Sequence, residues 1–248
     1  MLELTLPSLD FAQWAVVLFA LVLVGFAKTG ISGAGTVAIA LFALVLPTKS
    51  STGMLLPLLL VGDVVAVVTY RRHADWPRLL KLFPWVAVGV VVGAFVVRWV
   101  DDAQMRRIIG TILLVIIALH FWNRSRGSEL AEHRAVAASA GVFAGFTTMT
   151  ANAAGPIMAV YFLAAGLPML GFLGTTAWFF LTINAFKVPF SVALGLITPA
   201  TLTFAAVTAP AVVAGGVVGR VIVKRINRTW FERMTLALTF LAAIRLMF

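Results

Sequence analysis

The sequence predicts an all-α, polytopic membrane protein built from two repeats, and three observations support this fold class. Of its 248 residues, 62% are hydrophobic and 11% are charged, which lies well outside the composition of soluble domains. Apolar runs of membrane-spanning length recur along the whole chain, separated by short polar turns. A glycine-rich break at residues 25–35 interrupts an early apolar run, and a second copy of the break follows at residues 145–155.

Hydropathy and helix-breaking residues divide the chain into ten apolar segments. A bilayer core of about 30 Å requires about 20 helical residues, so six of the segments are long enough to cross a membrane. The first two segments of each half are shorter, and we expect them to form two hairpins of tilted or re-entrant helices. The ten expected segments are 11–27, 33–46, 51–70, 77–99, 104–122, 133–149, 153–166, 171–190, 199–223 and 229–247. Residues 1–10 are acidic and lack a basic region, so we do not expect a cleaved signal peptide.

Proline, glycine and polar positions outside the breaks also repeat. The matched pairs are Pro47 with Pro168, Gly53 with Gly174, Asp63 with Asn184, and Gly93 with Gly219. An internal duplication is the simplest explanation of this pattern. We therefore expect residues 1–123 to form a first transmembrane repeat, residues 132–248 a second, and residues 124–131 a cytoplasmic linker.

The distribution of basic residues favours inverted rather than parallel repeats. If the two short segments of each repeat make an even number of crossings, the second repeat is inverted. The basic loops 71–81, 124–134 and 220–233 then all face the cytoplasm, as the positive-inside rule requires. Parallel repeats would place the last two of these loops on opposite sides. The sequence therefore predicts two inverted repeats, each with a re-entrant or broken helix hairpin plus three transmembrane helices.

Composition argues against several other classes of protein. The net charge of +10 does not indicate nucleic-acid binding, because Lys and Arg lie in short loops rather than on one amphipathic face. The chain has no cysteine and three widely separated histidines, so we expect no metal site and no cofactor. An enzyme embedded in the membrane would need a nucleophile with a base or a metal cluster there, and none is apparent. We expect no catalytic residue.

The two glycine-rich breaks are predicted to form an anion-binding site. Non-helical backbone at membrane depth is tolerated where it is buried in protein or lines a cavity, and hairpins entering from opposite faces bring their tips together. A helix that restarts after a break presents free N–H groups and the positive end of its dipole. Neither break contains an acidic residue. The alternative is that these small residues only allow close helix packing.

The candidate ligands are side chains near the breaks that donate hydrogen bonds or carry positive charge. The candidates for substrate binding are Lys28, Thr29, Ser32, Thr148, Thr150 and Asn152. Three further polar residues, Asp63, Asn184 and Lys187, lie inside apolar segments, where buried charge is costly and marks function. We expect these three to support the site or to couple transport, with Asp63 as the proton carrier. Alternatively, Asp63 forms a structural pair with Lys28 or Lys187, or Lys187 snorkels to the membrane surface.

The breaks and their surroundings resemble the TauE/SafE sulfite exporter family, also called the toluene sulfonate uptake permease family. The resemblance covers essentially the whole chain. It rests on GFAKTGISGAG, GFTTMTANAAG and the spacing of Pro47, Gly53, Pro168 and Gly174. It implies a multi-pass carrier of the bacterial inner (plasma) membrane that moves sulfite, sulfoacetate or related organic anions, usually outward.

These observations lead to one functional hypothesis with two alternatives. The hypothesis is a secondary transporter that exports a small sulfur-containing oxyanion, driven by the proton motive force. The alternatives are a passive anion channel and an importer of another small organic anion. We expect the partners to be the anionic substrate and the lipid bilayer, without nucleic acid, and the GxxxG patterns permit a homodimer without requiring one. In this hypothesis the first break supplies charge through Lys28, and the second supplies mainly neutral donors.

Overall fold

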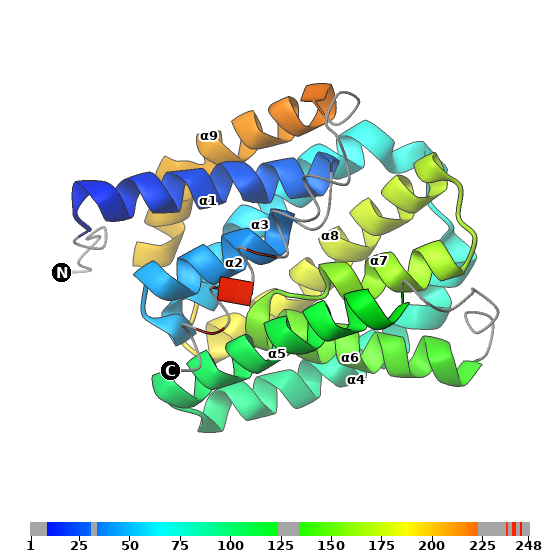
Figure 1. Ribbon diagram of the computed structural model, residues 1–248, viewed down its shortest axis with the longest axis horizontal. Coiled ribbons are helices and arrows are strands. Elements are labelled where there is room, and N and C mark those ends of the chain that lie inside the picture. The colour runs from blue at the N-terminus through cyan, green and yellow to red at the C-terminus, as the bar shows by residue number, and fades with distance from the viewer. Residues whose placement is uncertain are drawn as a thin grey trace.

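The computed structural model describes residues 9–30, 34–123 and 134–222 and the four separate residues 237, 240, 241 and 244. These residues form helices and no strand (Figure 1). The elements are α1 (Phe11–Thr29), α2 (Ala34–Val45), α3 (Thr48–Tyr70), the 3-10 helix η1 (Arg71–His73), α4 (Trp76–Trp99), α5 (Asp102–Asn123), α6 (Arg134–Ala151), α7 (Gly155–Ala164), α8 (Met169–Ala193) and α9 (Pro199–Ile222). The α-helices match the first nine predicted segments to within a few residues. The linker 124–131 and most of the predicted segment 229–247 lie outside the described residues.

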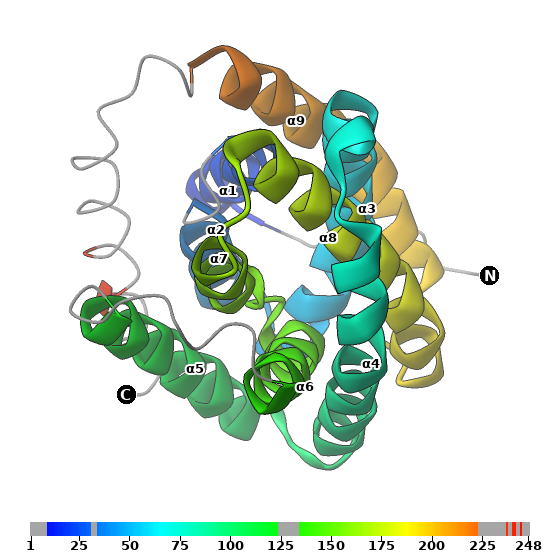
Figure 2. The same cartoon turned by 90° about the vertical axis from the view of Figure 1, so that its right-hand side faces the viewer.

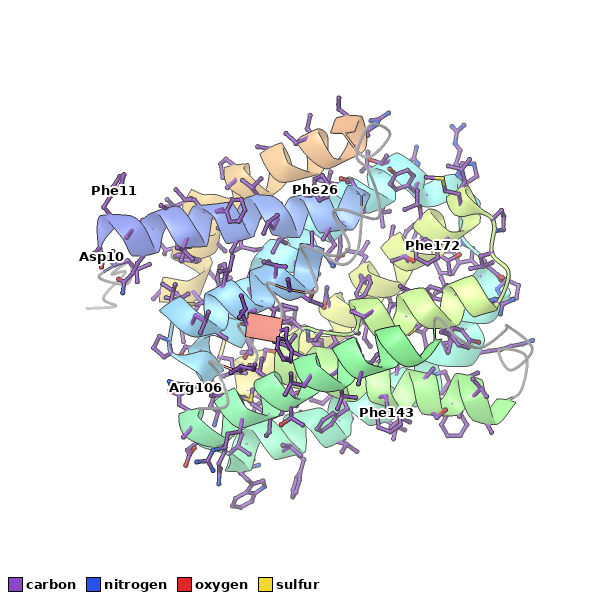
Figure 3. All side chains as sticks on the ribbon, in the orientation of Figure 1. Asp10, Phe11, Phe26, Arg106, Phe143 and Phe172 are labelled. Atoms are coloured by element: carbon purple, nitrogen blue, oxygen red, sulfur yellow. The ribbon has the colours of Figure 1, made fainter. Side chains whose placement is uncertain are left out.

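The lengths and surfaces of the helices are those of a multi-pass membrane protein. Among the described helices, α1, α3, α4, α8 and α9 are long and apolar enough to cross a bilayer. The short helices α2 and α7 contain 12 and 10 residues and cannot span it alone. Large apolar side chains such as Phe11 and Phe143, labelled in Figure 3, are mostly exposed on the outside. An apolar exterior of this kind suits lipid, so the predicted all-helical membrane fold is confirmed.

The long helices surround the two short ones. The most extensive contacts are those of α4 with α6, of α1 with α9 and of α1 with α2, followed by those of α3 with α8. Figure 1 shows α2 towards the left of the molecule and α7 towards the right. Seen from the end, in Figure 2, these two helices lie one behind the other inside the arc of long helices. The two short helices therefore lie roughly in line with each other inside the molecule.

Glycine brings the backbones of the long helices into direct contact. A Cβ atom on Gly25 of α1 would collide with the carbonyl oxygen of Val212 on α9, and one on Gly145 of α6 would collide with that of Val86 on α4. For Gly25 and Gly145, the structure therefore shows the role in close helix packing that was the alternative for the small residues of the breaks. Gly35 differs, because among the described residues its added Cβ would meet only the Cβ of Ala27, at an ordinary 3.6 Å.

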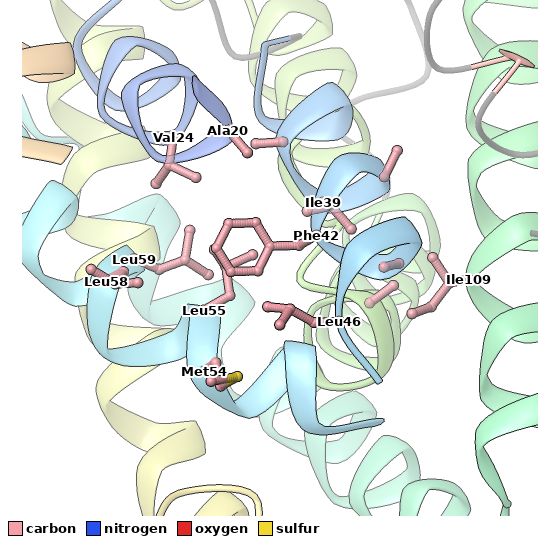
Figure 4. Packing of buried hydrophobic residues seen from close by; sticks show 14 of the residues in the cluster. Ala20, Val24, Ile39, Phe42, Leu46, Met54, Leu55, Leu58, Leu59 and Ile109 are labelled. Carbon is pink, nitrogen blue, oxygen red and sulfur yellow. The ribbon is translucent and has the colours of Figure 1, made fainter. Parts of the chain in front are cut away.

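Apolar packing buries both short helices away from lipid. Phe42 of α2 points into a cluster that includes Leu55 and Leu59 of α3 and Val24 of α1 (Figure 4). On the other side, Phe162 of α7 packs edge-to-face against a phenylalanine of α8 in a second cluster. Ala153 and Ala154, which precede α7, are buried in protein, the setting in which irregular backbone is tolerated at membrane depth.

Candidate functional site

A cavity of about 60 Å³ lies where the two glycine-rich breaks approach each other. A space of this size accommodates a few water molecules or a small anion. Its wall is mostly apolar, formed by residues of α1, α2, α3 and α8 together with the start of α7. The polar residues in the wall are Lys28, Thr36, Asp63, Asn152 and Thr176.

Both short helices begin at this cavity. Gly35 and Thr36 of the first turn of α2 line it, and so do Gly155 and Pro156 at the start of α7. The first N–H groups of a helix lack partners within the helix, and the dipole places positive potential at this end. Two such ends at one cavity favour an anion inside it.

Asn152 allows the chain to reverse between α6 and α7. Its φ of 53° is left-handed, a conformation that Asn tolerates better than most residues. Its side-chain amide donates from Nδ2 to the carbonyl oxygen of Thr52 on α3 at 3.1 Å. The second break is thereby anchored to the first half of the chain.

Lys28 places an ammonium group at the cavity wall. It lies in the last turn of α1, and its Nζ is 2.6 Å from Oδ1 of Asp63 on α3. The same ammonium lies 4.3 Å from the ring centroid of Phe180, a cation–π contact. The carboxylate of Asp63 is completely buried, so its pairing with a cation is essential to its stability there. Of the alternative partners for Asp63, the structure selects Lys28 for the direct ion pair.

Asn184 connects Asp63 to a second buried lysine. Its Nδ2 donates to Oδ2 of Asp63 at 2.6 Å, and its Oδ1 accepts from Nζ of Lys187 at 3.3 Å. Asn184 and Lys187 are both on α8, one helical turn apart, so α8 carries one edge of a continuous polar network.

Lys187 is buried within the protein rather than extended to the membrane surface. Its ammonium also donates to Oδ1 of Asn152 at 2.6 Å and to Oγ1 of Thr148 at 3.2 Å. The residue is 1% exposed, which excludes snorkelling. Lys187 does not line the cavity itself, but Asn152 stands between the two. The second half of the site therefore also contains a buried lysine, supplied by α8 rather than by the break.

Three other predicted ligands, Thr29, Thr148 and Thr150, do not line the cavity. Thr29 donates its hydroxyl to the carbonyl oxygen of Gly216 on α9 at 2.7 Å, and Thr150 donates to that of Phe146 on its own helix at 2.9 Å. Neither residue lines the cavity. Hydroxyl groups in membrane helices commonly return hydrogen bonds to backbone in this way. Ser32 lies outside the described residues.

Comparison with known families agrees with this arrangement. The family model described as "Sulfite exporter TauE/SafE" matches residues 17–246. The chain belongs to the TauE/SafE sulfite exporter family. Membership means an exporter-type membrane transporter for sulfite and related sulfur anions, and the resemblance seen in the two breaks is confirmed. No curated protein and no solved structure matches the chain.

In this TauE/SafE protein, Thr176 is a polar cavity residue that the sequence analysis missed. The residue lines the cavity, and its hydroxyl oxygen is buried and has no hydrogen-bond partner in the described part of the chain. Such a group calls for an explanation, and a bound anion would accept a hydrogen bond from it. Helical spacing was the available signal, because Thr176, Phe180, Asn184 and Lys187 recur at intervals of three or four residues along α8.

The polar network of this TauE/SafE protein contains lysines, amides and hydroxyls and one carboxylate. Within the described residues, no group of three or more His, Asp or Glu side chains is arranged to hold a metal ion. The donors at the cavity are N–H and O–H groups with one ammonium, which match the oxygens of an anion.

Proposed function

We propose that this protein is a secondary transporter that exports a small sulfur-containing oxyanion across the bacterial inner membrane. Sulfite or an organosulfonate such as sulfoacetate is the proposed substrate. The observation that carries this proposal is the meeting of an ammonium group and two helix N-termini at one cavity, formed by Lys28 and by the starts of α2 and α7. Family membership supports the class of substrate.

In this proposal the anion replaces its water shell with protein donors. Lys28 supplies an ion pair, Thr176 supplies a hydroxyl donor, and the first turn of α2 supplies backbone N–H groups. Asp63 already holds the Lys28 ammonium at 2.6 Å, so the anion and the carboxylate compete for it. Protonation of Asp63 would release Lys28 to the anion, which links substrate binding to the proton motive force.

We propose inverted repeats as the basis of alternating access. The paired contacts support this view, since α1 packs on α9 through Gly25 as α6 packs on α4 through Gly145. Asp63 and Asn184, at matched positions, bond to each other where α3 meets α8. Rocking of one half against the other about this contact would expose the cavity to each side in turn.

The test is sulfite flux from proteoliposomes that contain the purified full-length chain. A carrier gives saturable flux that responds to an imposed proton gradient, whereas a passive channel gives flux that does not saturate. Lys28→Gln removes the ammonium and is expected to lower flux by about tenfold or more, the loss of one charge-assisted hydrogen bond. Lys81→Gln is the matched control, because Lys81 is exposed on α4. Equal flux through wild type and Lys28→Gln would contradict the proposed site.

A further inference from the structure

Helices α3 and α8 run antiparallel, so the start of each lies beside the end of the other. A Cβ atom on Gly53, near the start of α3, would collide with the carbonyl oxygen of Leu196, just after α8. A Cβ atom on Gly174, near the start of α8, would lie 2.8 Å from the carbonyl oxygen of Tyr70, the last residue of α3. The start of α8 therefore lies at the end of the molecule that carries the basic residues of η1, which we call the basic end. The positive-inside rule predicts that this end faces the cytoplasm.

The match between Asp63 and Asn184 extends to the residues that precede them. One helical turn earlier, Leu59 on α3 matches Phe180 on α8. Because the two helices are antiparallel, Phe180 lies on the side of the Asp63–Asn184 contact that faces the basic end, and Leu59 lies on the opposite side. Leu59 and Phe180 therefore flank the central contact at equivalent positions.

The cavity extends unequally past these two residues. Both Leu59 and Phe180 line it. On α8 the wall continues beyond Phe180 to Thr176, one turn closer to the basic end. Among the described residues of α3, none before Leu59 lines the cavity, and Leu55, which matches Thr176, is buried in the apolar cluster of Figure 4. The cavity therefore stops at Leu59 and is displaced towards the basic end.

The side chains at the two matched levels also differ in size. Val24 of α1 and Ile39 of α2 line the cavity with Leu59 and belong to the same apolar cluster (Figure 4). The positions that match these two in the second half of the chain are Ala144 and Ala159. Phe180 therefore supplies the large apolar side chain of its set, whereas Leu59 shares that role with two neighbours.

We propose that Leu59 and Phe180 are the two gate residues of the transport path, Leu59 towards the outside and Phe180 towards the cytoplasm. The inference rests on the proposed transport function. In the conformation described, the Leu59 gate is closed and the anion reaches Thr176 past the open Phe180 gate, an inward-facing state. Rocking about the Asp63–Asn184 contact exchanges the two conditions. Packed apolar side chains close such a path because they exclude water and ions.

Phe180 is also placed to respond to the substrate. Its ring centroid lies 4.3 Å from the ammonium of Lys28, and this cation–π contact holds the ring beside the lysine. An anion that draws the ammonium into an ion pair weakens the contact and frees the ring to move across the path. Closure of the Phe180 gate is thereby linked to loading of the cavity.

The first test asks whether removal of the Phe180 side chain leaves the path open at both ends. Sulfite flux is recorded from proteoliposomes that contain the purified full-length chain or a variant of it. Wild type is expected to give saturable flux that responds to a proton gradient. Phe180→Ala is expected to lose both properties, because the cytoplasmic side stays open when the Leu59 gate opens. Phe180→Leu keeps a large apolar side chain and is expected to keep saturation.

Phe179→Ala is the matched control, because Phe179 is fully buried on the same helix and does not line the cavity. It is expected to lower the melting temperature without causing a leak. Saturable, gradient-dependent flux through a folded Phe180→Ala variant would overturn the gate assignment and leave the proposed function intact. Sulfite flux through wild type that is absent or does not saturate would instead overturn the proposed function.

A second measurement does not depend on the folding of Phe180→Ala. The chain contains no cysteine, so single cysteines can be introduced at the matched positions Thr176 and Leu55. Each variant is treated with a membrane-impermeant methanethiosulfonate in inside-out vesicles, which present the cytoplasmic face to the reagent. Thr176→Cys is expected to lose its free thiol and Leu55→Cys to keep it, since the cavity reaches only the first of these positions. Modification of Leu55→Cys at an equal or higher rate, or of neither variant, would overturn the inference.

Discussion

Asn184 donates a hydrogen bond to Asp63 at 2.6 Å, and the two residues occupy matched positions in the two halves of the chain. One half thus carries a carboxylate where the other carries an uncharged amide. Each residue also contacts a lysine, Lys28 for Asp63 and Lys187 for Asn184. Their contact forms the middle of the network Lys28–Asp63–Asn184–Lys187.

Exchanging the two central residues tests whether this network tolerates a moved charge. Asp63→Asn alone leaves Lys28 without its carboxylate and is expected to destabilise the fold by about 3–5 kcal/mol, the cost of breaking a buried pair. Adding Asn184→Asp restores one carboxylate. In the wild-type chain, Oδ1 of Asn184 lies 3.3 Å from Nζ of Lys187, so the new carboxylate is placed to pair with Lys187. We therefore expect the double variant to recover part of the melting temperature in detergent. Additive losses in the double variant would argue against coupling through this contact.

Gly25 and Gly35 belong to the same break but are predicted to respond differently to alanine. The Cβ of Gly25→Ala collides with the backbone of α9, and overpacking of this kind costs about 1–3 kcal/mol. Gly145→Ala, which collides with α4, is expected to cost about the same. Gly35→Ala meets only Ala27 at 3.6 Å and should leave the melting temperature unchanged. Thermal unfolding of the three variants in one detergent checks this order.

Thr176→Val tests the unpartnered hydroxyl in the cavity wall. Valine keeps the shape and removes a donor that has no partner among the described residues, so stability should not fall. Loss of one hydrogen bond to a charged ligand is expected to weaken sulfite binding by about 1.5–3 kcal/mol, measured by calorimetry. Thr150→Val is the control, because that hydroxyl donates to Phe146 within its own helix. Equal affinities for the two variants would show that Thr176 does not contact the substrate.

Asn152 combines a left-handed backbone with two side-chain contacts, and two substitutions separate these roles. Asn152→Gly accepts the φ of 53° but loses the contacts to Lys187 and Thr52. Asn152→Ala loses the contacts and also strains the backbone, so it should be less stable than Asn152→Gly by about 1–2 kcal/mol. The difference between the two unfolding free energies isolates the backbone contribution. A more stable alanine variant would contradict this account of the turn.

The positions of the helices and of the breaks were predictable because hydropathy and glycine affect the segment of chain in which they occur. The transfer free energy of a segment into lipid depends on its own composition, and the described α-helices therefore follow the predicted segments closely. The duplicated break also marked the region of the cavity correctly, since Lys28 and Asn152 both line it. Thr29 and Thr150 were chosen for the same chemical reason, yet their hydroxyls donate to backbone. A hydrogen-bonding residue near a break does not reveal which way its helix is turned.

The sequence by itself determined that this chain is a helical membrane protein with two similar breaks. Both features depend on residues close together in the chain, because a segment enters lipid according to its own apolar residues and glycine interrupts a helix where it stands. Only the tertiary structure decided that Lys28 rather than Lys187 pairs directly with Asp63, and that Thr176 faces the cavity. Ion pairs and hydrogen bonds depend on ångström distances between helices far apart in sequence. Those distances are set by how α1, α3 and α8 pack, and the order of residues does not contain them.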